Sequence, residues 1–289
     1  MTSQPKRALV LSGGGVRGAY QVGVLKKWLL EDNKDYDVLC GVSVGALNTL
    51  SLAKFLPGHS ATAFKLLESI WCDISDDRLL CNWRPFGKLT ALWKKSIYDS
   101  SPLKNLIKGV FDSEAIRNSG KIIRIGAICL NTGEEYFANE NDDNLDEWAI
   151  ASASYPVFME PIIIDNKLWI DGGIKIIAPI SQAIRAGATE IDVILCSSQE
   201  NSKPWLCKQR LLPLSDIMMR CIDLMSERII RADVRITGIN NDLVILDSKY
   251  KEIKIRIIKP SVYLTDNNLK FNNEDIKRMM QIGYEDACK

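Results

Sequence analysis

The segment from Asp37 to Asn48, Asp-Val-Leu-Cys-Gly-Val-Ser-Val-Gly-Ala-Leu-Asn, constrains the fold more than any other part of the chain. A short apolar run ends in the pattern Gly-x-Ser-x-Gly, formed by Gly41, Ser43 and Gly45, and an apolar-rich segment without proline follows. This order predicts a strand, a sharp turn and a helix, and therefore a nucleophile elbow that exposes the Ser43 hydroxyl at the helix N-terminus. Roughly 0.1 matches to the pattern are expected by chance in a chain of this length. The strand-turn-helix setting is therefore what makes the prediction specific.

A glycine-rich loop, residues 13–18, follows the first predicted strand at residues 7–12 and leads into residues 19–30, where apolar side chains recur at helical spacing. Consecutive glycines at a helix N-terminus present backbone N–H groups that can hold a developing oxyanion. Because this loop and the Ser43 turn follow two successive strands, a parallel sheet would place them side by side. Two interpretations of Arg17 stay open: it orients the loop or meets a phosphate, or it forms a surface salt bridge.

The spacing of these glycines, G-x-G-x-x-G over residues 13–18, also fits a dinucleotide-binding unit. Such a unit needs an acidic residue at the tip of its second strand to bind the ribose. That tip here carries Gly41-Val42-Ser43. We therefore expect no dinucleotide cofactor.

The chain contains one histidine, His59, in the turn after the helix that follows Ser43. That helix of about 11 residues would carry His59 roughly 16 Å from the serine, at 1.5 Å per residue. A solvated loop histidine is therefore the better interpretation than a member of a Ser-His-Asp triad. If Ser43 is a nucleophile, another residue is its base.

A carboxylate at a strand end is a second candidate for chemistry. Residues 162–170 form two apolar runs typical of a hairpin, and they deliver Asp171-Gly172-Gly173. Asp-Gly-Gly is commonly just a turn, but glycines after a strand-end carboxylate also allow another backbone to approach closely.

The remaining pattern predicts an alternation of strands and helices without linkers or repeats, so we expect one domain over residues 1–289 with a helical, aromatic cap segment at about 71–120. The cap is either packed, or an interfacial surface of aromatic rings and lysines. An apolar stripe at helical spacing over 214–233 indicates core packing first and a dimer or membrane face second. The other predicted elements are strands at 121–130, 135–138, 190–196, 243–247 and 254–259, and helices at 61–75, 148–154, 179–187 and 273–287, the last capped by Asn273-Glu274-Asp275.

Composition excludes several classes of function. With 37 Lys and Arg against 36 Asp and Glu, the chain has no global field that would draw it to nucleic acid. It shows no signal peptide and no apolar run long enough to span a bilayer, so we expect a cytoplasmic protein that contacts a membrane surface transiently. Eight cysteines without a Cys-x-x-Cys pair, together with a single histidine, predict no metal site.

Three motifs in this order together resemble the patatin-like phospholipase family: the loop from Gly13 to Gly18, the Ser43 elbow and Asp171-Gly172-Gly173. Residues 151–156, Pro179, Ala183, Gly187 and residues 282–284 extend the likeness over most of the chain. The resemblance implies a three-layer α/β/α fold with a mainly parallel central sheet. It implies a catalytic dyad of Ser43 and Asp171, an oxyanion hole at Gly13, Gly14 and Gly15 with Arg17 and Gly18 completing that motif, and support of the two turns by Gly41, Gly45, Gly172 and Gly173.

The function that this resemblance implies is hydrolysis of fatty-acyl esters, most simply those of phospholipids, through an acyl-enzyme on Ser43. A carboxylate with a pKa near 3.9 is a weak base for a hydroxyl, so we expect Asp171 to be poorly exposed and close to Ser43. The chain departs from plant members at residues 174–179, which lack asparagines before the proline, and we expect no appended calcium-binding domain. No cofactor and no calcium requirement are expected. An esterase or lipase acting on neutral or soluble esters, and a catalytically silent lipid-binding effector, are the alternatives.

Overall fold

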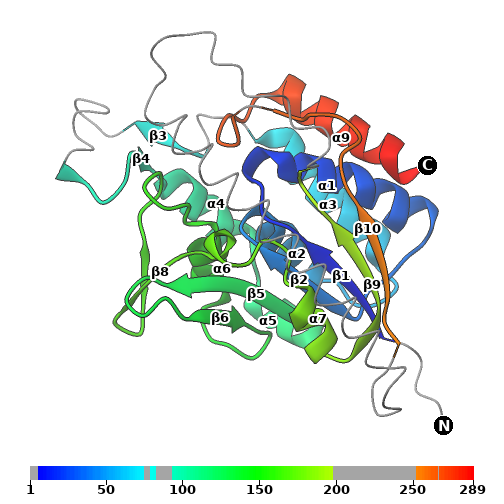
Figure 1. Ribbon diagram of the computed structural model, residues 1–289, viewed down its shortest axis with the longest axis horizontal. Coiled ribbons are helices and arrows are strands. Elements are labelled where there is room, and N and C mark those ends of the chain that lie inside the picture. Colours follow the sequence, from blue (N-terminus) through cyan, green and yellow to red (C-terminus); the bar gives the residue numbers. More distant parts are fainter. Residues whose placement is uncertain (1–5, 75–78, 83–92, 198–251, 266) are drawn as a thin grey trace.

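The computed structural model describes residues 6–74, 79–82, 93–197, 252–265 and 267–289 (Figure 1). The predicted helix at 214–233 and strand at 243–247 lie outside these residues. The described strands are β1 (Lys6–Leu11), β2 (Val38–Val42), β3 (Cys81–Asn82), β4 (Tyr98–Asp99), β5 (Ile122–Cys129), β6 (Glu135–Ala138), β7 (Ile162–Ile164), β8 (Lys167–Asp171), β9 (Ala188–Ile194) and β10 (Lys254–Ile258). The described α-helices are α1 (Gly18–Leu25), α2 (Val44–Ala53), α3 (Ser60–Asp73), α4 (Ser101–Val110), α5 (Ser113–Asn118), α6 (Leu145–Ala153), α7 (Ile180–Arg185) and α9 (Asn273–Ala287).

The central sheet has the strand order β10-β9-β1-β2-β5-β8-β7, with β6 also paired to β5 (Figure 1). The five strands from β10 to β5 are parallel, whereas β6 and β8 run antiparallel to β5. The hairpin of β7 and β8 is antiparallel as well. Parallel strands require crossover connections, which the helices between β1, β2 and β5 supply. The mainly parallel sheet predicted from the sequence is confirmed.

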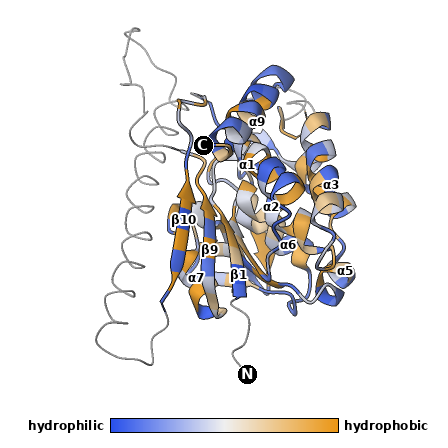
Figure 2. Cartoon of the chain, turned by 90° about the vertical axis from the view of Figure 1, so that its right-hand side faces the viewer, coloured by the Kyte–Doolittle hydropathy of each residue, from blue (hydrophilic) through white to orange (hydrophobic). Residues whose placement is uncertain are grey.

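Helices cover both faces of this sheet, which gives the three layers that were expected. Alternate side chains of a strand point to opposite faces. Leu9 and Leu11 of β1 accordingly pack into the core formed with α1, α2 and α6, whereas Ala8 and Val10 pack into the core that contains Ile180 of α7. Figure 2 shows α7 on the opposite side of the sheet from α1, α2, α3 and α9.

The C-terminal helix α9 lies along α1, the first helix of the chain, so the two helices share one layer (Figure 1). Gly23 of α1 and Gly283 of α9 make this close approach possible, because a Cβ at either position would overlap the backbone of the other helix. The N-cap of α9 is Asn272, whose side chain accepts from the N–H of Asp275 at 2.8 Å. The predicted cap at Asn273 is therefore wrong by one residue.

Residues 75–78 and 83–92 of the predicted cap segment lie outside the described residues, and the rest of the segment includes both core and surface residues. Trp71 at the end of α3 is buried, and its Nε1–H donates to Asn48 Oδ1 of α2 at 2.8 Å. Trp93, by contrast, is 82% exposed. His59 is an exposed residue immediately before α3, as the sequence predicted. Within the described residues, no helix combines the length and apolar character needed to cross a bilayer.

Candidate active site

Ser43 lies on a tight elbow between β2 and α2, with backbone angles of φ 56° and ψ −130°. A residue other than glycine adopts this left-handed region only where the surrounding structure fixes it. Close packing shapes the elbow: a Cβ at Gly41 would overlap the backbone of Gly45, and a Cβ at Gly45 would overlap the carbonyl of Leu11 in β1. The elbow therefore needs glycine on both sides of the serine, at the carboxyl edge of the parallel strands.

Asp171 reaches the same edge from the other direction. It ends β8, which runs antiparallel to β5 with Asp171 opposite Ala127. The neighbouring residue of β5, Gly126, pairs with Val42 of β2, immediately before Ser43. Two strands of opposite direction thus deliver the serine and the aspartate to adjoining positions on β5.

The Asp171 carboxyl group is 1% exposed, as expected. Its Oδ1 accepts the N–H of Gly173 at 2.7 Å, whereas no described residue donates a well-aligned hydrogen bond to the buried Oδ2. Burial raises the pKa of Asp171 to about 7, and the nearby Ser43 hydroxyl and the Gly173 amide oppose this rise. The Ser43 hydroxyl is thus near enough to the Asp171 carboxyl to lower its pKa, although it donates no well-aligned hydrogen bond to Oδ2.

The glycine loop contributes amides to this site, but not all of them equally. The N–H of Gly13 donates to the carbonyl of Ile177 at 3.0 Å, so this amide is already engaged. A Cβ at Gly13 would lie 3.3 Å from Cβ of Ser43, and this residue therefore keeps the loop close to the elbow. The amides of Gly14 and Gly15 donate to no other described residue. They are the donors of the predicted oxyanion loop that remain available to a ligand.

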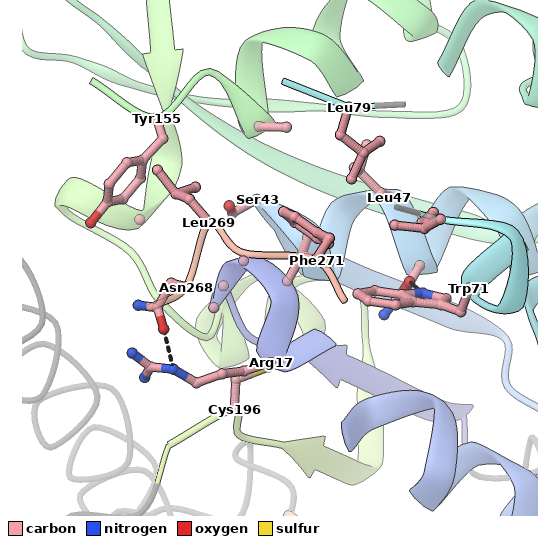
Figure 3. Close-up of a pocket in the computed structure, with 18 of the residues that line it drawn as sticks. Arg17, Ser43, Leu47, Trp71, Leu79, Tyr155, Cys196, Asn268, Leu269 and Phe271 are labelled. Carbon is pink, nitrogen blue, oxygen red and sulfur yellow. Dashed lines mark hydrogen bonds between the residues drawn. The ribbon is translucent and has the colours of Figure 1, made fainter. Parts of the chain in front are cut away.

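Arg17 ties the glycine loop to a segment far along the chain. Its Nε–H donates to Oδ1 of Asn268, and the N–H of Val16 donates to the backbone carbonyl of the same asparagine at 2.8 Å (Figure 3). Of the two interpretations left open by the sequence, these contacts favour a role in orienting the loop.

One cavity of about 180 Å³ brings most of the predicted residues together. Gly13, Gly14, Gly15, Arg17, Ser43, Asp171 and Gly173 line it. Gly18, Gly41, Gly45 and Gly172 do not line it; they pack behind the turns. Ser43, Leu269 and Phe271 all line this cavity, and Figure 3 labels them. The other walls are mainly apolar and come from Leu47, Leu67, Ile70, Trp71, Leu103, Leu106, Ile107, Val110, Phe111 and Met159.

Two contributors to the site were missed by the sequence analysis. Asn268 and residues 260, 262–265, 269 and 271 line the cavity, although nothing in their local pattern signals this position. Ser152 accepts the N–H of Ser43 at 3.0 Å. Its motif at residues 151–156 was noted as a family likeness, but without a role.

A profile of the patatin-like phospholipase family matches residues 9–184, which is more than half of the chain. The chain belongs to the patatin-like phospholipase family. The matched range contains Ser43, Asp171 and the glycine loop, whereas α9 and the cavity residues 260–271 lie beyond it.

Several curated proteins are similar to this patatin-like chain. A cGAMP-activated phospholipase of Pseudomonas aeruginosa is 28% identical over 195 residues, covering 62% of this chain and 56% of that protein. A cGAMP-activated phospholipase of Escherichia coli is 30% identical over 191 residues, covering 58% and 52% respectively. A probable lipid hydrolase, 463L, of invertebrate iridescent virus 6 is 27% identical over 190 residues, covering 62% and 63%. The chain thus spans between half and two thirds of the length of these relatives.

Among solved structures, VipD from Legionella pneumophila has a similar fold, with a TM-score of 0.51 over 98% of this chain and 66% of that one. The sequence identity is 15%, so this likeness concerns the fold alone. It agrees with the three-layer arrangement and the mainly parallel sheet described above.

Proposed function

We propose that this protein is a lipid acyl hydrolase that cleaves fatty-acyl ester bonds of phospholipids, with Ser43 as nucleophile and Asp171 as base. The observation that carries the proposal is the position of the Ser43 hydroxyl beside a buried carboxyl group whose pKa is raised to about 7, in one apolar cavity. The names of the bacterial and viral relatives, phospholipases and a lipid hydrolase, support the same class of substrate.

In the first half of the reaction, the oxygen of Ser43 attacks the ester carbonyl carbon while Oδ2 of Asp171 takes the hydroxyl proton. The carbonyl oxygen becomes an oxyanion, which in this proposal accepts from the amides of Gly14 and Gly15, since neither amide donates to another described residue. When the tetrahedral intermediate collapses, the alcohol leaves with the proton from Asp171. The acyl group then remains on Ser43.

In the second half, water enters next to the acyl-enzyme and Asp171 takes one of its protons. The resulting hydroxide equivalent attacks the acyl carbonyl, the same amides hold the new oxyanion, and Ser43 leaves with the proton. A base with a pKa near the working pH is efficient in both directions of this proton transfer. The raised pKa of Asp171 gives it that property without a histidine.

The apolar walls of the cavity favour a substrate with a long acyl chain. Each methylene group that leaves water contributes about 0.8 kcal/mol. Leucine, isoleucine and aromatic side chains from α2, α3 and α4 offer that environment directly next to Ser43. We propose that the substrate is taken from a membrane surface by transient contact, and that the reaction needs no metal or cofactor.

The test compares hydrolysis of mixed phospholipid vesicles with hydrolysis of a soluble short-chain ester, with and without EDTA. Fatty-acid release from vesicles that is insensitive to EDTA supports the proposal. Hydrolysis of the soluble ester alone would favour the esterase alternative, and vesicle binding without release would favour a silent lipid-binding protein. Because two relatives are named as cGAMP-activated, one arm includes cGAMP; release only in that arm would make this an activated phospholipase.

A further inference from the structure

Ser152, at the C-terminal end of α6, is fully buried and uses its hydroxyl group twice. Its Oγ accepts the backbone N–H of Ser43 at 3.0 Å and donates to the backbone carbonyl of Gly126 in β5 at 2.7 Å. The hydroxyl therefore links the nucleophile elbow to the strand next to it. Neither bond involves the Ser43 side chain, so Ser152 does not touch the reacting atoms.

The hydrogen bond between Ser152 and the Ser43 amide involves a residue whose backbone conformation is intrinsically unfavourable. Ser43 has φ 56°, in the left-handed region that residues other than glycine rarely adopt. Such a conformation persists where neighbouring groups fix it. Ser152 supplies a side-chain acceptor to the Ser43 amide, and it thereby fixes the direction in which the Ser43 side chain leaves the elbow.

Gly126, the other partner of Ser152, lies where the strands that carry the nucleophile and the base meet. Gly126 pairs with Val42, the residue before Ser43, and the next residue of β5 pairs with Asp171. A Cβ at Gly172 would lie 2.5 Å from the carbonyl oxygen of Gly126, the same oxygen that Ser152 contacts. The position of this carbonyl is thus linked to both turns.

The same end of α6 also holds the base. The backbone N–H of Asp171 donates to the carbonyl of Ser154 at 3.0 Å, two residues after Ser152. The end of α6 therefore hydrogen-bonds the backbone of Ser43 through the Ser152 side chain and the backbone of Asp171 through the Ser154 carbonyl.

We propose that Ser152 is a positioning residue that sets the separation between the Ser43 hydroxyl and the Asp171 carboxyl. This inference rests on the proposed function, because it assumes that Ser43 and Asp171 react together. Loss of the Ser152 hydroxyl frees the Ser43 amide and lets the strained elbow relax, so the acylation rate falls while substrate binding in the apolar cavity stays unchanged.

Ser119 provides a control that distinguishes positioning of the elbow by Ser152 from ordinary support of the fold. Ser119 is also buried, and its Oγ donates to the carbonyl of Ile116 at 2.7 Å and accepts the N–H of Lys121 at 3.2 Å. It makes the same pair of bonds, but before the start of β5, at the opposite edge of the sheet from Ser43. Truncation of either serine to alanine removes one accepted and one donated hydrogen bond to the backbone. Only Ser152 makes one of these bonds to the elbow.

The experiment measures the rate at which an alkyl fluorophosphonate labels Ser43, together with kcat and KM for a phospholipid substrate, in wild type, Ser152→Ala, Ser152→Cys and Ser119→Ala. We expect Ser152→Ala to lower the labelling rate and kcat roughly 10- to 100-fold with KM unchanged, the size of effect that a small displacement of a reacting group brings. Ser152→Cys keeps the volume of the side chain with a weaker acceptor, so we expect a smaller loss and a folded protein. We expect Ser119→Ala to match wild type in rate, whatever its loss in melting temperature.

The outcomes distinguish this inference from the proposed function. Labelling of Ser43 at equal rates in wild type and in the folded Ser152 variants overturns the positioning role and leaves the proposed function standing. Loss of rate in Ser119→Ala equal to that in Ser152→Ala overturns it as well. Absence of labelling at Ser43 in the wild type overturns the proposed function, and the positioning role falls with it.

Discussion

In the proposed function, Asp171 alone must act as the base that takes the proton from the Ser43 hydroxyl. An exposed aspartate is deprotonated at neutral pH, but it is too weak a base to take a proton from a serine hydroxyl efficiently. Burial of Asp171 corrects this, since its pKa rises from 3.8 to about 7. The Gly173 amide at 2.7 Å limits the rise and fixes Oδ1, whereas the buried Oδ2 accepts no well-aligned hydrogen bond from a described residue.

The pH dependence of catalysis should report this group directly. Asp171 acts as a base only when it is deprotonated, so kcat/KM should rise with pH and level off above an inflection near the raised pKa of about 7. Measurement of kcat/KM at constant ionic strength over the range in which the protein stays folded checks this. A profile that stays flat well below neutral pH would show that Asp171 is not the titrating base.

Burial of the same carboxyl should cost stability, with a definite dependence on pH. The pKa of the folded protein lies above the unfolded value of 3.8, so the penalty is absent below that value and is fully developed once the pH exceeds about 7. It then approaches about 4 kcal/mol as an upper bound. We expect Asp171→Asn to be inactive, and to be more stable than wild type by a larger margin at alkaline than at acidic pH.

Denaturant unfolding at one acidic and one alkaline pH checks this prediction. A variant that is less stable than wild type at alkaline pH, or whose gain does not depend on pH, would contradict the assigned environment of Asp171.

At the scale of elements, the site depends on how closely α2 approaches β1. The two elements touch at Gly45, where any Cβ would overlap the carbonyl of Leu11. This close packing brings the N-terminus of α2 to the carboxyl ends of the central strands. A helix N-terminus stabilises a developing negative charge there. The approach of α2 to β1 therefore depends on the absence of a side chain at Gly45.

A pair of helical glycines tests this dependence. Gly45→Ala in α2 should destabilise the fold by several kcal/mol or prevent folding, because backbone atoms cannot yield to the new methyl group. Gly109→Ala in α4 should instead stabilise it by about 0.5–1 kcal/mol, since nothing lies within 4 Å of the added Cβ and alanine favours helix. Thermal unfolding of both variants measures the contrast. Equal effects in the two would mean that the elbow is not packed as described.

At the scale of the whole molecule, the cavity is assembled from distant parts of the chain. Residues 260, 262–265, 268, 269 and 271 lie beyond the range that matches the family profile, yet they line the cavity, and Asn268 contacts the glycine loop. Part of the cavity wall thus comes from outside the matched range, whereas Ser43 and Asp171 lie inside it.

The sequence could predict the features of this protein that have local causes. Gly41, Ser43 and Gly45 form a short pattern, and apolar runs predicted β2, β5 and the hairpin of β7 and β8. The role of Asn268 could not be predicted, because it arises from a contact with Arg17 across 251 residues of sequence. The engagement of the Gly13 amide by Ile177 likewise depends on tertiary packing.

If the proposed function is right, Ser43 and Asp171 act together on a lipid ester, and loss of either side chain stops the reaction. Fatty-acid release from phospholipid vesicles is followed for wild type, Ser43→Ala and Asp171→Asn, each shown to be folded, with and without EDTA. We predict release by wild type that ignores EDTA and falls by roughly 10³-fold or more in both variants. Release that persists in either folded variant, or that disappears when EDTA is added, would contradict the claim.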